Sequence, residues 1–146
     1  MFKVLVATDG SIHALKGAEY AARMMAKMND VMVTLLYVGQ SSETVFPFLD
    51  TGRGMVDQDA LTQAVNEIGN SVLANTAKAF SATTAKVETR VLVGEAANVI
   101  SKIANEEKYD LVILGSRGLT DLQGIVVGSV SERVAHQTRV PVLIVR

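Results

Sequence analysis

The stretch at residues 111–129, LVILGSRGLTDLQGIVVGS, restricts the fold of this chain more than any other. Its first four residues, Leu111 to Leu114, are apolar and typical of a short buried strand, and glycines follow at positions 115, 118, 124 and 128. Glycine tolerates positive φ and lets a ligand approach the main chain closely. A strand, a glycine-rich loop and a helix start form an arrangement that binds anions through backbone N–H groups. The stretch therefore predicts either a phosphate-binding loop or, if the loop binds nothing, a flexible connection.

The composition predicts one globular domain covering residues 1–146. Hydrophobic residues make up 49% of the chain and charged residues 20%, which is ordinary for a soluble protein. A net charge of −1 and an aromatic content of 5% argue against a surface that binds nucleic acid or an anionic membrane. The chain has no Cys, which excludes disulfides, thiolate nucleophiles and cysteine metal sites.

Targeting and membrane segments are not apparent in the sequence. No apolar run approaches the roughly 20 residues of a membrane span. A strand-like run begins at Lys3, which leaves no room for a signal peptide. We therefore expect a cytoplasmic protein without membrane insertion.

Apolar strand-like runs alternate with longer helical patterns along the whole chain. We expect strands at 3–8, 31–38, 86–93, 111–114 and 142–145, and helices from 12 to 30, 57–80, 95–107 and 129–137. Residues 39–55 contain Gly, Ser and Pro, which indicates a long loop. In the second helix, the apolar stripe is expected at Leu61, Val65, Ile68 and Val72. Strict alternation predicts an α/β fold with an open, parallel five-stranded sheet and helices on both faces.

Two loops are expected to meet at the carboxyl edge of this sheet. In such sheets the ligand lies where the strand order reverses. The loop at 8–11, TDGS, follows the first strand, and the glycine loop follows the fourth. They can form one site only if these two strands are neighbours, as in the order 3-2-1-4-5.

The glycine loop differs from the common phosphate-binding motifs. It lacks the Lys-Ser or Lys-Thr pair of a Walker A loop and the G-x-G-x-x-G dinucleotide pattern. Its own pattern is G-x-x-G, nine residues, then Gly128-Ser129. This dipeptide would present N–H groups and a hydroxyl at the start of the last helix, where the dipole favours an anion. Alternatively, Ser129 is a plain N-cap, with Glu132 completing a capping box.

This spacing resembles the signature of the ATP-binding branch of the universal stress protein family. Residues 3–11, KVLVATDGS, are similar to the family's first strand and loop. Residues 128–135, GSVSERVA, and 140–145, VPVLIV, are similar to its C-terminus. The resemblance thus covers the whole chain. It implies the adenine nucleotide α-hydrolase-like fold, with the strand order 3-2-1-4-5.

Carried over residue by residue, the resemblance implies a site for ATP, or for ADP or AMP. Ala7 and Thr8 would border the adenine, the main chain of Val38 would bond its edge, and Leu114 and Gly115 would line the ribose. Arg117 and Gly118 would lie at the phosphates, and Gly128, Ser129 and Val130 at the phosphate end. Asp9 would lie beside the ribose or beside Mg²⁺ or Mn²⁺ bound to the phosphates. The residues themselves leave two alternatives open: Asp9 could only shape a turn or cap a helix, and Arg117 could be a solvated loop cation.

The function expected from these observations is nucleotide-dependent regulation or sensing in a stress response. We find no positioned nucleophile or strong general base, so no catalytic residue is assigned and at most slow ATP hydrolysis is expected. The alternatives are an ATP-cleaving enzyme of the same fold and a dimeric interaction protein without nucleotide. The first would need a Ser-Gly-Gly-type loop, of which the loop at 8–11 is a poor version.

The last strand, Val142 to Val145, is apolar and lies at a sheet edge in the predicted order, which makes it a template for pairing. The family resemblance implies that two such edges pair in a homodimer. We also expect a client or regulatory protein as a partner.

Overall fold

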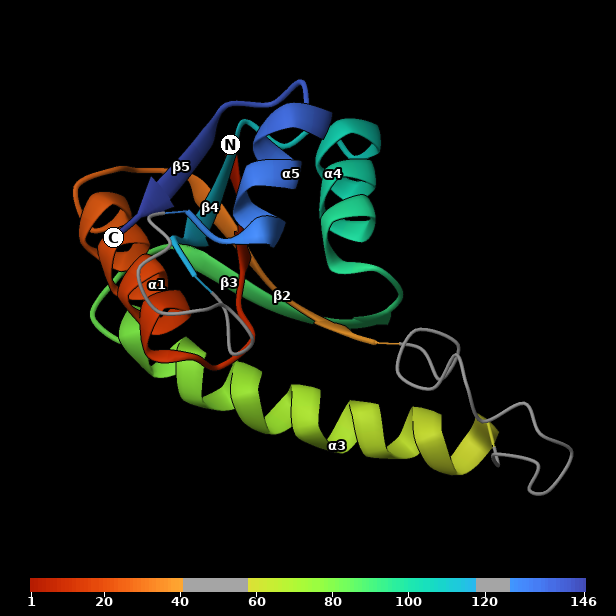
Figure 1. The fold of residues 1–146 in the computed structure, drawn as a ribbon. Coiled ribbons are helices and arrows are strands. Elements are labelled where there is room, and N and C mark those ends of the chain that lie inside the picture. The colour runs from red at the N-terminus through yellow and green to blue at the C-terminus, as the bar shows by residue number, and fades with distance from the viewer. Residues whose placement is uncertain (41–57, 118–126) are drawn as a thin grey trace, which may run out of the picture.

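The computed structural model describes residues 1–40, 58–117 and 127–146. Five parallel strands form one sheet in the order β3-β2-β1-β4-β5 (Figure 1). The strands are β1 (Phe2–Ala7), β2 (Val31–Gly39), β3 (Lys86–Val93), β4 (Leu111–Gly115) and β5 (Val142–Val145). The helices are α1 (Ile12–Met25), α3 (Gln58–Ala77), α4 (Ala96–Glu106) and α5 (Ser129–Gln137), and a 3-10 turn, η1 (Lys78–Phe80), follows α3. The predicted α/β fold and strand order are confirmed.

The helices form a layer on each face of the sheet (Figure 1). On one face, Val4 and Val6 of β1 pack in a core that includes Met25 of α1 and Leu73 of α3. On the other face, Leu5 packs in a core with residues of α4 and α5. Successive side chains of a strand point to opposite faces. This explains why the inner strands β1 and β4 are continuous apolar runs, whereas the edge strand β3 contains Glu88, Thr89 and Arg90.

The buried stripe of α3 differs from the predicted one. Ile68, expected inside, is 56% exposed, whereas Val65 is buried as expected. The buried positions are Val65, Gly69, Leu73 and Thr76. Gly69 is the reason for the shift, because a Cβ there would lie 2.7 Å from the Tyr37 ring. The stripe therefore runs through a glycine, which an apolar pattern does not mark.

The first helix is also shorter than predicted. It ends at Met25 and not at Asp30. Asp30 has a φ of 55°, in the left-handed region that Asp tolerates better than most residues. The chain thus turns before β2 begins at Val31.

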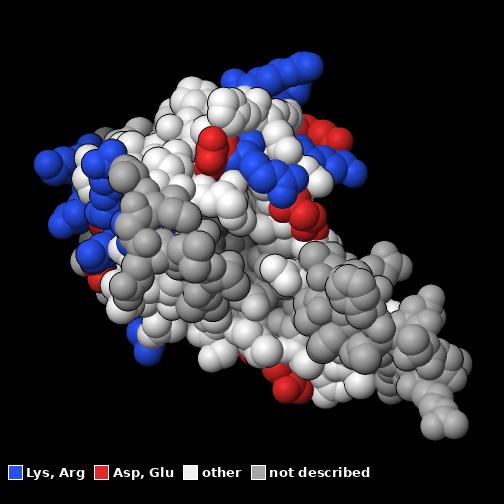
Figure 2. Space-filling model, viewed as in Figure 1, with Lys and Arg blue, Asp and Glu red and all other residues white. Residues whose placement is uncertain are grey.

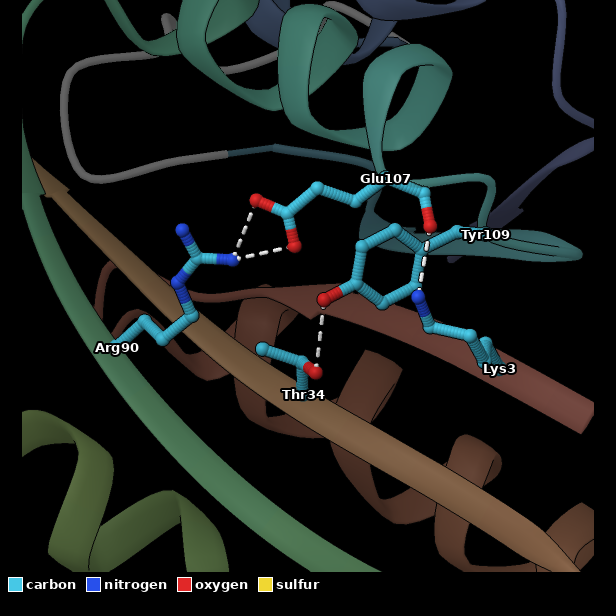
Figure 3. A network of polar contacts seen from close by, with 5 residues as sticks. All are labelled: Lys3, Thr34, Arg90, Glu107 and Tyr109. Carbon is cyan, nitrogen blue, oxygen red and sulfur yellow. Dashed lines mark hydrogen bonds and ion pairs between the residues drawn. The ribbon is translucent and has the colours of Figure 1, made fainter. Parts of the chain in front are cut away.

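A polar network fixes the C-terminal end of α4 against the sheet (Figure 3). The buried Tyr109 hydroxyl donates to Thr34 Oγ1 of β2 at 2.9 Å. Arg90 of β3 donates to both carboxylate oxygens of Glu107 at 2.8 Å, and this bond raises the pKa of the guanidinium. Lys3 Nζ of β1 donates to the Glu107 carbonyl at 2.7 Å. Contacts to three strands therefore position α4.

Within the described residues, none of the helices combines the length and hydropathy that a bilayer crossing requires.

Candidate functional site

A cavity of about 330 Å³ lies at the carboxyl ends of β1, β2 and β4, between the starts of α4 and α5. This is the edge where the strand order reverses, since β1 has β2 on one side and β4 on the other. The register pairs Val6 of β1 with both Leu35 and Ile113, so the loops after β1 and β4 emerge side by side. The loop at 8–11 and the described first residues of the glycine loop line the same cavity here. The volume lies at the lower end of the range for small-molecule pockets.

The cavity brings together most of the residues predicted for the site. Those that line it are Ala7, Thr8, Asp9, Val38, Leu114, Gly115, Arg117 and Val130. Gly128 and Ser129 lie at the start of α5 but do not line the cavity. Gly118 lies outside the described residues.

The cavity also contains residues that the sequence argument missed. They are Ala14, Leu36, Tyr37, Gln40, Ala96, Ile100 and Ser131. Those from α4 could have been found, because a helix that follows a parallel strand starts at the same sheet edge as the other ligand loops. Ser131 could not have been identified in this way, because serines are common near helix starts, where they cap the helix.

Asp9 shapes the loop between β1 and α1 while it lines the cavity. Its Oδ1 accepts from the Ser11 N–H at 2.9 Å, and Gly10 adopts a φ of 82°. The cap of α1 is Ser11, whose hydroxyl accepts from the Ala14 N–H at 3.2 Å. Asp9 therefore shapes the turn and also lines the cavity, whereas the cap of α1 is Ser11 and not Asp9. A turn of this kind holds the carboxylate at the cavity wall.

Tyr37 forms a polar corner of the cavity together with Asp9. Burial raises the pKa of the Tyr37 phenol above its ordinary value, and the negative charge of Asp9 raises it further. The phenol is therefore protonated at neutral pH. The Tyr37 ring packs beside Gly69 of α3, on the α1/α3 face of the sheet.

Arg117 follows β4 by two residues and contributes a cation to the cavity wall. Its Nε is buried and, within the described part of the chain, has no hydrogen-bond partner. A buried polar group of this kind is costly unless something pairs with it. Arg117 as a whole is partly exposed, so burial affects its Nε and not the entire side chain.

The helices α1, α4 and α5 all begin near this edge. They differ in whether a side chain accepts hydrogen bonds from the N–H groups of the first turn. Ser11 caps α1. Glu95 caps α4, accepting from the N–H groups of Ala97 and Asn98 at 3.2 and 3.0 Å. At α5 the cap is Gly128, which has no side chain to accept a bond. The predicted capping box is therefore wrong, because Ser129 is the first helical residue and not the cap.

Charges near the two helices around the cavity are largely neutralised. Arg133 of α5 donates to Glu95 at 2.8 Å. Figure 2 shows positive and negative side chains next to one another over α4 and α5. The Glu95 carboxylate already provides the negative charge that the dipole of α4 favours at its N-terminus. An anion in the cavity would consequently be attracted to the start of α5 and not to that of α4.

A metal site made by side chains alone is absent from the described residues. No group of three or more His, Cys, Asp or Glu there could hold an ion.

Comparison with known proteins decides the family. The model of the universal stress protein family matches residues 1–146. The chain belongs to the universal stress protein family. It is 33% identical to universal stress protein MJ0531 of Methanocaldococcus jannaschii, over 99% of this chain and 81% of that one. It is also 33% identical to universal stress protein YxiE of Bacillus subtilis, over 99% of this chain and 98% of that one.

Solved structures of the family share this fold. The structure of protein MJ0577 superimposes with a TM-score of 0.81 at 29% identity, covering 99% of this chain and 94% of that one. A universal stress protein in complex with cAMP superimposes with a TM-score of 0.65 at 26% identity, covering 99% and 96%. A family member with a comparable fold therefore binds an adenine nucleotide.

Proposed function

We propose that this universal stress protein binds an adenine nucleotide, ATP in particular, at the carboxyl edge of its sheet, and that occupancy regulates a partner in a stress response. The observation that carries the proposal is one cavity lined by Arg117, whose buried Nε has no hydrogen-bond partner among the described residues, and by Val130 and Ser131 of α5, a helix whose start has no side-chain cap. Both attract an anion. The relative that binds cAMP supports an adenine nucleotide as the ligand.

The apolar wall of the cavity suits the base and ribose. Ala96 and Ile100 of α4 face the strand ends across it, and we assign the adenine to the space between them and Ala7. The main chain of Val38 would bond the adenine edge. Thr8 would border the adenine together with Ala7, and Leu114 and Gly115 would line the ribose, with Asp9 beside it.

The phosphates would extend from the ribose toward α5. We assign them to Arg117, to the main chain of Gly118 and Val130, and to the hydroxyl of Ser129, with Gly128 leaving space at the phosphate end because it has no side chain. Mg²⁺ or Mn²⁺ would bind mainly through phosphate oxygens, and the Asp9 carboxylate lies at the same cavity wall. The cation would offset phosphate charge that a single arginine cannot balance.

We propose slow hydrolysis at most. The Asp9 carboxylate is engaged by the Ser11 N–H, and the Ser131 hydroxyl donates to a main-chain carbonyl, so neither is poised as a base or nucleophile.

We further propose a homodimer through β5. This strand lies at the sheet edge and, among the described strands, pairs only with β4 (Figure 1). A groove beside it is lined by Tyr20 and Arg23 of α1 and by residues 143–146. An apolar edge strand with a groove beside it suits a second copy of the chain.

The direct test of nucleotide binding is to purify the protein, denature it and identify released nucleotides by mass spectrometry. We expect an adenine nucleotide in near-stoichiometric amount. The control is Gly128→Val, which should fold, because the Gly128 backbone (φ −71°, ψ 158°) is accessible to any residue. Its side chain would crowd the phosphate end, so it should carry little nucleotide. Equal nucleotide in both proteins would remove the α5 start from the site.

A further inference from the structure

The start of α5 is tied to the end of β4 by two hydrogen bonds. The Ser131 hydroxyl donates to the Gly115 carbonyl at 2.7 Å, and the Gly128 N–H donates to the Ser116 carbonyl. Figure 1 shows the start of α5 next to the end of β4. Ser116 is itself fixed, since its N–H donates to Val145 of β5 at 2.7 Å. The two ends of the glycine loop are therefore joined at its base.

Ser131 is a buried serine whose hydroxyl makes a specific hydrogen bond. It is only 5% exposed, and both it and Gly115 line the cavity. Its bond spans the loop, because the two residues are 16 positions apart in the chain. The hydroxyl also satisfies a carbonyl at the cavity wall. A carbonyl oxygen there without a donor would repel a phosphate.

We infer that Ser131 is a positioning residue for the phosphate end of the nucleotide, an inference that rests on the proposed function. By bonding Gly115, it holds the N–H groups at the start of α5 at a fixed distance from the strand that carries the ribose. Anion binding by a helix start depends on this geometry, since N–H groups interact with an anion only at hydrogen-bond distance. Ser131 acts through the helix and does not itself contact the ligand.

The same helix is fixed in a second direction by Arg133 and Glu95. That ion pair is about half exposed on the Arg133 side, so its contribution is small. The buried bond of Ser131 is the stronger constraint, because burial prevents water from replacing its partner.

The experiment compares Ser131→Ala with Ser101→Ala by calorimetric titration of ATP and of adenosine. Ser101 is a matched control: it is 4% exposed, lies on α4, and its Oγ has no hydrogen-bond partner in the described part of the chain. We expect Ser131→Ala to bind ATP about tenfold more weakly and adenosine unchanged. Ser101→Ala should match the wild type with both ligands. Ser131→Thr, which retains the hydroxyl, should restore ATP affinity.

The ATP-to-adenosine comparison separates positioning from general loss of structure, which would weaken both ligands. If Ser131→Ala does not fold, Ser131→Cys keeps the size with a weaker donor and should again lose ATP affinity selectively. Equal ATP affinity in the wild type and the folded Ser131 variant overturns the inference and leaves the proposed function intact. A wild type that binds neither ligand overturns the proposed function.

Discussion

Gly115 must be a glycine because α1 packs against it, independently of any ligand. The family resemblance implied that it lines the ribose. In the structure it ends β4 opposite Val145, and a Cβ there would collide with the main-chain carbonyl of His13 in α1. The helix can lie this close to the strand only because Gly115 and Gly17 have no side chains. The glycine thus allows α1 to pack beside the cavity.

Replacing Gly115 by Ala should therefore destabilise the fold even without ligand. The Cβ would meet main-chain atoms, which cannot rotate away, and we expect a loss of about 1–3 kcal/mol in the free energy of unfolding. Gly17→Ala is the control, because its Cβ would lie 3.1 Å from the Gly115 nitrogen and should cost less. Urea denaturation of the nucleotide-free proteins measures both. A Gly115→Ala protein as stable as the wild type would show that the helix moves freely.

The sequence allows some individual site residues to be predicted and not others. Asp9 and Arg117 were predictable because their loops follow inner strands. The bond between Ser131 and Gly115 was not, because nothing in a helix start shows which distant carbonyl its hydroxyl reaches. The same holds for Gly115 and His13, which lie about a hundred positions apart.

Among the elements, α4 depends most on long-range contacts. Its inward residues were predictable from spacing, as with Ile100, which is 3% exposed. Its place over the sheet is set by the network at its other end, where Thr34 and Tyr109 meet (Figure 3). The prediction of the buried face of α3 was wrong at Ile68 for a related reason. The buried face includes Gly69, and a glycine does not contribute to a hydrophobic pattern.

The Thr34–Tyr109 bond should show strong coupling in a double-mutant cycle. Both hydroxyls are buried, so Tyr109→Phe or Thr34→Val alone leaves one polar group unpaired and should cost about 1–3 kcal/mol. The double variant removes both groups and should cost clearly less than the sum of the two. Chemical denaturation measures the four proteins. Additive losses would show that the hydroxyls do not stabilise α4 through one another.

At the scale of the whole molecule, the strand order was the most predictable property. Strict alternation of strands and helices requires crossovers, and right-handed crossovers leave few topologies. Placing the two candidate loops together then selected the order 3-2-1-4-5, which the structure has. What occupies the free edges could not be predicted in the same way, because an edge strand indicates a partner without identifying it.

The proposed homodimer makes a specific prediction for β5. Ile144 is half-buried and belongs to neither core cluster, so Ile144→Lys should leave the monomer folded. Across a two-fold axis it would bring like charges together and should yield monomers in sedimentation velocity. Val93→Lys, at an exposed position on the opposite edge strand, is the control and should remain dimeric. An Ile144→Lys protein that sediments as a dimer would exclude β5 as the interface.

The central claim, that an adenine nucleotide occupies the cavity between the ends of β1 and β4, is tested most directly by calorimetric titration of ATP into the nucleotide-free protein and its Ala96→Phe variant. Ala96 is partly exposed, opens α4 and lines the cavity at the margin of the core, so a phenyl group there should fill the adenine space. We predict one ATP bound per wild-type chain and none to the variant, with unchanged circular dichroism. Equal binding by both proteins, or none by the wild type, would contradict the account.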